Sequence, residues 1–208
     1  MCAIFGFTSP SLKKEQVLPY FEKTKSRGPD DTRLEPAGSG MLGFHRLAIM
    51  GLHPEGMQPF HRGGDMAVCN GELYGFRPVK KALEAKGYVF ASDSDCEIIL
   101  PLWQEYGTEM FAGLDAEFAM IIYDSASDSL VAARDPIGIR PLFYGYLADG
   151  SIIFASEAKN LVGLCTHVFP FPPGHYYKDG KFVRYTDLTT VTRYSSDDLD
   201  TVTKKIRE

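Results

Sequence analysis

Two Asp-Gly pairs, Asp149-Gly150 and Asp179-Gly180, constrain the fold of this chain more than any other feature. Each pair lies between two short apolar or aromatic stretches and supplies the backbone conformations that a tight turn between antiparallel strands requires. A polar segment, 124–128, separates two further apolar stretches in the same way. The sequence therefore predicts antiparallel hairpins. The predicted strands are 2–7, 41–49, 66–69, 119–123, 129–133, 142–147, 151–155, 176–178 and 181–183.

Helices are predicted in three segments. Pro19 should kink or shorten the first segment, and Gly87 should end the second. The third opens with the Ser94 to Glu97 spacing of a capping box, and Pro101 should kink it. The predicted helices are 11–24, 79–86 and 94–106.

Strands grouped in hairpins, with a few helices set apart, predict an α+β fold. We expect one domain over 2–190. The sequence then turns polar and charged, so 191–208 is predicted to be a linker into the start of a further domain.

The charge and the apolar runs exclude several classes of protein. The formal net charge of −5 argues against broad binding to nucleic acid or to an anionic membrane. The longest apolar run, 118–122, is too short to span a bilayer, and the apolar stretch 3–7 lacks the flanks of a signal peptide. We therefore expect a cytoplasmic protein with four reduced thiols. The five histidines form neither HxH nor HExxH, so no metal site is expected.

Cys2 stands apart from the other cysteines. Cys69, Cys96 and Cys165 form no CxxC pair and are expected to be packing residues. Removal of Met1 would leave Cys2 with both a thiol and a free α-amine, whose pKa of about 7.7–8.0 suits a general base. Cys2 is therefore a candidate N-terminal nucleophile, and a bystander at the chain terminus is the other interpretation.

Asn70-Gly71 follows a predicted strand and has two interpretations. Asn-Gly is a common turn pair. The alternative is an oxyanion hole, in which the Asn70 side-chain amide and the Gly71 backbone N–H point at a developing negative charge. The pair alone does not decide between them.

Arg46 and Asp95 are candidates for binding an amino-acid substrate. An arginine matches a carboxylate, and an aspartate can bind an ammonium group. Each residue also has an ordinary structural role, as the end of a strand and the start of a helix. The loop that begins with Arg27-Gly-Pro-Asp30 is interpreted as structural.

The order of the motifs resembles that of a known family, the N-terminal glutaminase domain of glutamine-dependent asparagine synthetases, a class II glutamine amidotransferase. The resemblance covers about 2–190. The motifs that carry it are Cys2-Ala-Ile-Phe-Gly6, Arg27-Gly-Pro-Asp30, His45-Arg-Leu-Ala-Ile49, Asn70-Gly-Glu-Leu-Tyr74, Ser94-Asp-Cys-Glu97, Phe118-Ala, Ala133-Arg-Asp135, Gly138-Ile-Arg-Pro-Leu142, Phe154-Ala-Ser-Glu157 and Pro172-Pro-Gly174.

The resemblance implies the four-layer αββα sandwich of N-terminal nucleophile hydrolases, with antiparallel sheets. It also implies that Cys2 attacks glutamine, forms a thioester and releases ammonia, with Asn70 and Gly71 as the oxyanion hole. Arg46 would bind the substrate carboxylate, and Asp95, helped by Glu72, would bind its ammonium. The backbone of 47–50, with Leu47, Ile49 and Met50, would line the pocket. The family usually has Asn where this chain has Gly75.

The resemblance also implies partners. The ammonia would serve asparagine synthesis from aspartate and ATP in a C-terminal synthetase domain. No Gly-rich phosphate-binding loop occurs in this chain, so ATP and magnesium are expected only in that domain. The oligomeric state is left open, a homodimer included.

Other interpretations stay open. The chain could be the glutaminase domain of another class II amidotransferase, because the ammonia acceptor lies outside these residues. It could be an N-terminal cysteine amidase, against which Arg46 and Asp95 argue. It could also be a catalytically silent interaction domain, against which the presence of Cys2 argues.

Overall fold

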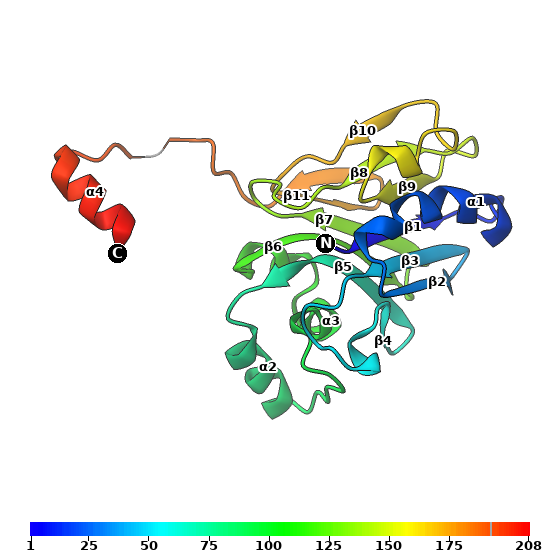
Figure 1. Ribbon diagram of the computed structural model, residues 1–208, viewed down its shortest axis with the longest axis horizontal. Coiled ribbons are helices and arrows are strands. Elements are labelled where there is room, and N and C mark those ends of the chain that lie inside the picture. The colour runs from blue at the N-terminus through cyan, green and yellow to red at the C-terminus, as the bar shows by residue number, and fades with distance from the viewer. Residues whose placement is uncertain (192) are drawn as a thin grey trace.

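Two six-stranded antiparallel sheets form the centre of the protein in a computed structural model that describes residues 1–191 and 193–208 (Figure 1). In spatial order, the first sheet consists of β10 (Val168–Pro170), β8 (Phe143–Tyr146), β9 (Ile152–Ala155), β1 (Ala3–Thr8), β3 (Gly40–Arg46) and β2 (Asp31–Ala37). The second consists of β12 (Lys181–Arg184), β11 (His175–Lys178), β7 (Ser129–Arg134), β6 (Ala116–Asp124), β5 (Asp65–Leu73) and β4 (Phe60–Arg62).

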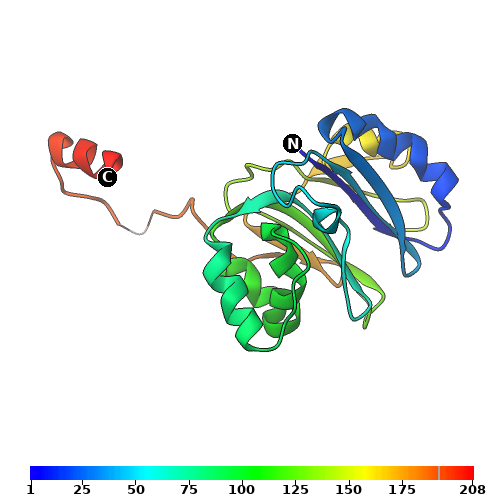
Figure 2. The ribbon, with the colours of Figure 1, turned by 60° about the horizontal axis from the view of Figure 1, so that its bottom comes forward.

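Helices cover the outer faces of both sheets (Figure 2). On the first sheet lie α1 (Lys14–Phe21) and the short 3-10 segments Glu22–Arg27 and Ala158–Asn160. On the second lie α2 (Phe76–Ala85), the 3-10 turn η3 (Asp95–Ile98), α3 (Ile99–Tyr106) and the 3-10 segment Gly107–Gly113. The predicted α+β class and the four-layer αββα sandwich are confirmed.

Three separate apolar cores hold the four layers together, and β6 shows how one strand serves two of them. Ala119 and Ile121 face the core between the sheets, whereas Met120 and Ile122 face the core under α2 and α3. Successive side chains of a strand point to opposite faces, so a strand between two cores is apolar at every position. This explains why the apolar run 118–122 in β6 is unbroken.

All nine predicted strands are present, but three further strands were not predicted. The missed strands, β2, β4 and β10, all lie at an edge of a sheet. Edge strands tolerate prolines and charged residues, which weaken the alternation of apolar residues on which the prediction relied. Pro36 lies in β2, and Pro170 ends β10.

The helices differ from the prediction at their ends. Pro19 lies near the end of α1, which gives way to the 3-10 segment after Phe21. Pro101 lies in the first turn of α3, where a proline is tolerated, so the predicted kink is replaced by a change from η3 to α3. The predicted capping box is wrong, because the Glu97 carboxylate accepts hydrogen bonds from the backbone N–H groups of Ala91 (2.6 Å) and Ser92 (2.8 Å) instead.

The N-terminus begins a central strand. β1 pairs with β3 on one side and with β9 on the other, and Ala3 lies opposite His45. Cys2 therefore enters the sheet beside the end of β3 and faces the loop that follows it. This arrangement fixes the position of a terminal residue that would otherwise be mobile.

The C-terminal helix α4 (Leu199–Arg207) lies apart from both sheets (Figure 1). Its first turn is capped by the Asp198 carboxylate, which accepts from the Thr201 N–H at 2.8 Å. The division into a domain over 2–190 and a linker over 191–208 stays a prediction. Within 1–191 and 193–208, no helix has the length and apolar character needed to cross a membrane.

Candidate active site

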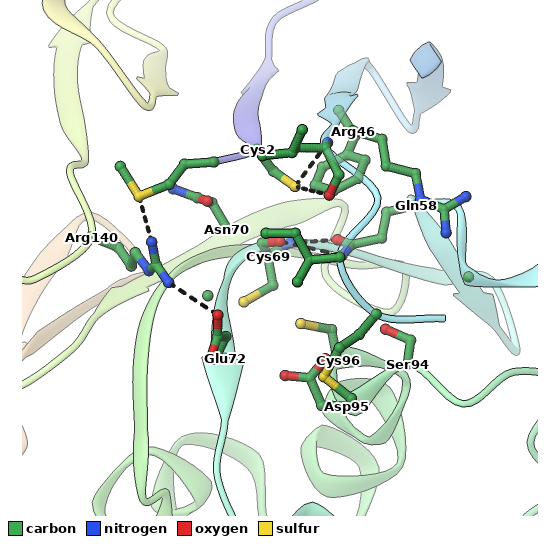
Figure 3. A pocket seen from close by; sticks show the side chains of 17 residues that line it. Cys2, Arg46, Gln58, Cys69, Asn70, Glu72, Ser94, Asp95, Cys96 and Arg140 are labelled. Carbon is green, nitrogen blue, oxygen red and sulfur yellow. Dashed lines mark hydrogen bonds and ion pairs between the residues drawn. The ribbon is translucent and has the colours of Figure 1, made fainter. Parts of the chain in front are cut away.

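A single cleft brings together all nine residues that the sequence singled out for catalysis or substrate binding (Figure 3). Its volume is about 200 Å³. It lies between the start of β1, the loop after β3, the end of β5 and η3. The nine residues are Cys2, Arg46, Leu47, Ile49, Met50, Asn70, Gly71, Glu72 and Asp95. The remaining lining residues are Met1, Phe44, Gly56, Gln58, Cys69, Ser94, Cys96 and Arg140.

The thiol of Cys2 is held by one backbone unit. The Leu47 N–H donates to Cys2 Sγ at 3.3 Å, and Sγ lies 3.5 Å from the Leu47 carbonyl oxygen, to which the thiol donates. The predicted strand 41–49 ends at Arg46, and this early end frees the Leu47 peptide to contact the thiol. Burial raises the pKa of the Cys2 thiol, and the Leu47 hydrogen bond opposes that effect.

The loop that begins at Arg27 also holds Cys2. Arg27 Nε donates to the Cys2 carbonyl oxygen at 3.0 Å, and Arg27 Nη1 forms an ion pair with Glu157 Oε1 at 2.9 Å. A Cβ at Gly28 would lie 2.2 Å from the His45 carbonyl oxygen, so only glycine lets the loop approach β3 this closely. The loop that was interpreted as structural therefore positions the candidate nucleophile.

Asn70 and Gly71 lie inside β5, so their interpretation as a turn is wrong. The predicted strand 66–69 continues to Leu73. Asn70 is 2% exposed, and within 1–191 and 193–208 its side-chain Nδ2 has no hydrogen-bond partner. A buried donor without a partner is costly, which points to a ligand that accepts from it. Figure 3 shows the Asn70 side chain to the lower left of the Cys2 label.

The backbone of β5 provides a second donor beside Asn70. The N–H of Cys69 donates to Gln58 Oε1 at 2.6 Å, and the N–H of Leu73 donates to Asp95 Oδ2 at 2.7 Å. Alternate residues of a strand direct their N–H groups to the same edge, so the N–H of Gly71 points to this edge as well. Gly71 and Asn70 both line the cleft.

The glycine at position 71 has a steric cause. A Cβ there would lie 2.4 Å from the Glu117 carbonyl oxygen of β6. Gly71 therefore lets β5 and β6 pack closely at the floor of the cleft. Gly75, where the family usually has Asn, has a φ of 60° and precedes α2. Asn is among the residues that adopt this left-handed conformation most readily, so the departure preserves the turn.

The guanidinium of Arg46 is buried and holds the loop after β3. It donates to the carbonyl oxygens of Gly51 and His53, the latter at 3.3 Å. A guanidinium has five N–H donors, so these two bonds leave others for a ligand. Arg46 thus shapes the loop that carries Ile49 and Met50 and contributes a positive charge to the cleft.

Two acidic groups line the opposite part of the cleft. Asp95 is 5% exposed, and its Oδ2 accepts from Leu73 as described above. Glu72 is more exposed, with its Oε1 3.7 Å from Arg140 Nη2, and Arg140 is also paired with Glu117. The cleft therefore has a cationic side at Arg46 and an anionic side at Asp95, as an amino-acid ligand requires.

Gln58 and Arg140 were not predicted as site residues. The segment around Gln58 reads only as a Gly- and Pro-containing loop, and its role depends on contact with a distant strand. Arg140 lies in a turn-rich motif to which no specific role was assigned. Cys69 and Cys96 are buried, as expected, although both also line the cleft. The described residues contain no group of three or more His, Cys, Asp or Glu side chains that could hold a metal ion.

Two facing antiparallel sheets between helical layers form the four-layer fold of the N-terminal nucleophile hydrolase type. Solved structures share this fold. The chain aligns with the glutamine phosphoribosylpyrophosphate amidotransferase from B. subtilis with a TM-score of 0.73 at 20% identity, over 89% of this chain and 49% of that chain. It aligns with an allosteric regulatory enzyme of purine biosynthesis with a TM-score of 0.72 at 19% identity, over 92% of this chain and 50% of that chain. At these identities the likeness concerns the fold.

The sequence comparison is more specific. A family profile described as a glutamine amidotransferase domain matches residues 1–175, so the chain belongs to the glutamine amidotransferase family. The chain is similar to a probable glutamine-hydrolysing asparagine synthetase of Dictyostelium discoideum, with 37% identity over 89% of this chain and 35% of the relative. The glutamine-hydrolysing asparagine synthetase of Sandersonia aurantiaca is 38% identical over 88% of this chain and 35% of the relative. The chain thus spans about a third of the length of the curated relatives it matches.

Proposed function

We propose that this chain hydrolyses glutamine to glutamate and ammonia, with Cys2 as the nucleophile once Met1 is removed. The observation that carries the proposal is the buried, unpartnered amide of Asn70 in the same cleft as the Cys2 thiol. A donor with no partner, next to a nucleophile, is what an oxyanion hole needs before substrate binds. Membership of the glutamine amidotransferase family supports the same activity.

Removal of Met1 supplies the general base. Met1 lines the cleft, and its sulfur contacts Arg140, so its removal also opens the mouth of the cleft. The α-amine left on Cys2 would titrate near ~7.7–8.0 and could accept the thiol proton. Such a base is needed because burial raises the pKa of the thiol.

The reaction then proceeds in two steps. The Cys2 sulfur attacks the side-chain carbonyl carbon of glutamine, and the resulting oxyanion accepts from Asn70 Nδ2 and the Gly71 N–H. The C–N bond breaks, the proton taken from the thiol passes to the leaving nitrogen, and ammonia departs from a thioester. Water attacks the thioester, the C–S bond breaks, and glutamate and the free thiol are formed.

The charges of the cleft fit the amino-acid end of glutamine. Arg46 would bind the α-carboxylate, and Asp95, with Glu72, would bind the α-ammonium. The cleft volume of about 200 Å³ lies below the range of about 300–1,000 Å³ typical of drug-sized ligands and suits one amino acid. If the substrate had no free α-carboxylate and α-ammonium groups, Arg46 and Asp95 would have no substrate group to bind.

We further propose that the ammonia serves asparagine synthesis from aspartate and ATP, in a synthetase domain C-terminal to this one. The support is the 37–38% identity with asparagine synthetases about three times as long. ATP and magnesium would bind in that domain, so we expect this chain alone to release free ammonia. A nucleophilic thiol must stay reduced, which favours the cytoplasm.

The test is glutamine hydrolysis by purified chain whose Cys2 N-terminus is verified by intact mass. Ammonia and glutamate should form in equal amounts, and Cys2→Ala should abolish both. Cys165→Ala is the matched control, because Cys165 lies outside the cleft, and its activity should equal that of the wild type. A processed wild-type chain that forms no ammonia would favour a silent interaction domain instead.

A further inference from the structure

Gln58 makes an unusual contact with the strand that carries Asn70. Its side chain is buried, its Oε1 accepts from the Cys69 N–H at 2.6 Å, and its Nε2 donates to the Cys69 carbonyl oxygen at 3.2 Å. A neighbouring strand would make the same two bonds with its backbone. Here one side-chain amide replaces a strand at the edge of β5.

The register of the sheet explains why a side chain is needed at this point. β4 pairs with β5 from Phe60↔Ala67 to Arg62↔Asp65, and the same register continued by two residues places Gln58 opposite Cys69. β4 begins only at Phe60, so the backbone of Gln58 is not part of the paired strand. The side chain of Gln58 thus extends the pairing along β5 by one further position.

The extra position lies directly before the candidate oxyanion hole. The Cys69 carbonyl belongs to the same planar peptide unit as the Asn70 N–H, so the Gln58 bond fixes the orientation of the unit that leads into Asn70. On its other edge, β5 stays paired with β6, where Asn70 lies opposite Ala119. Two residues beyond Cys69, the edge of β5 opens to the cleft at Gly71.

We propose that Gln58 is a positioning residue for the oxyanion hole, because its amide completes the edge of β5 and thereby fixes Asn70 and the Gly71 N–H at the spacing that the oxyanion requires. This inference rests on the proposed glutaminase activity. Gln58 acts through Cys69, since both polar atoms of its side chain are engaged there. It therefore affects the transition state, where the oxyanion forms, and leaves the binding of glutamine unchanged.

Two substitutions at this position separate the two bonds. Gln58→Met keeps the length of the side chain and removes both bonds with Cys69. Gln58→Glu keeps an acceptor for the Cys69 N–H but loses the donor to the Cys69 carbonyl. Gln104→Met is the matched control, because the Gln104 amide contacts the Asp65 carboxylate at the opposite end of β5, at 3.5 Å, and lies outside the cleft.

The processed wild type and the three variants should be compared in glutamine hydrolysis. We expect kcat to fall by about 10- to 100-fold in Gln58→Met, with KM within about twofold of the wild type. This fall is smaller than the one expected when an oxyanion donor itself is removed. Gln58→Glu should fall by a similar factor near neutral pH. Part of its deficit should be restored as pH falls, because a protonated carboxyl regains one donor. Gln104→Met should keep the wild-type kcat.

Two further measurements distinguish positioning from general damage to the fold. The γ-aldehyde analogue of glutamine forms a tetrahedral adduct with Cys2, so its inhibition constant should rise by the same factor as kcat/KM falls. Methyl methanethiosulfonate reacts with the thiol without forming an oxyanion, so its rate at Cys2 should stay at the wild-type value. Loss of both reactivities together would mean damage to the whole site and would overturn the proposal.

Other results would also overturn it. A rise in KM with unchanged kcat would make Gln58 a substrate contact, and an unchanged kcat/KM would make it a bystander. A wild-type chain that fails to hydrolyse glutamine refutes the proposed function itself, whereas an active wild type with unaffected Gln58 variants refutes only this inference.

Discussion

Replacement of Asn70 by leucine should change activity and stability in opposite directions. Asn70 Nδ2 is buried and without a partner in the described part of the chain, and leucine has nearly the same size without polar atoms. If Nδ2 donates to the oxyanion, its removal should lower kcat by about 100- to 1,000-fold, or about 2.7–4 kcal/mol of transition-state stabilisation. KM should change little, because the bond forms fully only in the transition state.

The stability of the free protein should not fall. An unpartnered buried donor destabilises the folded state by about 1–3 kcal/mol, so its removal should leave the free energy of unfolding unchanged or raise it by up to that amount. For a chain of this length, each kcal/mol corresponds to about 2–4 °C in Tm. The assay therefore pairs steady-state glutamine hydrolysis with thermal unfolding in the absence of glutamine.

Asn160 provides the control. Its Nδ2 is also buried but donates to Tyr20 O (2.8 Å), Phe21 O (3.2 Å) and Thr24 Oγ1 (3.0 Å). Asn160→Leu should therefore lose about 1–3 kcal/mol of stability and keep its kcat. An Asn70→Leu variant that unfolds at a lower temperature than Asn160→Leu, or that keeps the wild-type kcat, would refute the assignment of Asn70 Nδ2 as an oxyanion donor.

Two further predictions concern pH. In a form that retains Met1, Cys2 should react with iodoacetamide only at a pH above the ordinary range of thiol pKa values, because burial raises the thiol pKa. In the processed form, the rate of this reaction should rise with a midpoint at a pH near ~8, the usual pKa of an α-amine. Equal midpoints in the two forms would contradict a role for the α-amine. His45 is buried, and burial lowers its pKa, so as pH falls the unfolded chain binds a proton at this imidazole before the folded protein does. The free energy of unfolding should therefore decrease as pH drops below about 6.5, by at most about 1.4 kcal/mol per pH unit. His45→Gln should flatten this part of the curve of unfolding free energy against pH, and an unchanged slope would assign it to other groups.

The sequence predicted the centre of each sheet better than its edges. β6 and β7 lie between two cores, so their apolar runs and the polar turn between them are visible in the sequence. The edge strands β2 and β10 contain prolines, and their pairing depends on neighbours that a local pattern does not reveal.

The candidate site follows the same division. Cys2 and Asp95 could be identified as candidate site residues from position and motif, because their chemistry lies in the side chain. The contacts that hold the thiol are backbone groups of Leu47, and the partner of Cys69 is a side chain from a distant loop. Such contacts depend on the register between strands, which no single motif specifies.

The position of the N-terminus at the start of a central strand has a practical consequence for producing this protein. The first residues form part of the cleft wall, and Met1 already lies at its mouth beside Arg140. A purification tag or fusion partner at this end would fill the space intended for substrate and keep the amine of Cys2 in a peptide bond. Such additions are better placed away from the N-terminus, for example beside α4, which lies apart from both sheets (Figure 2).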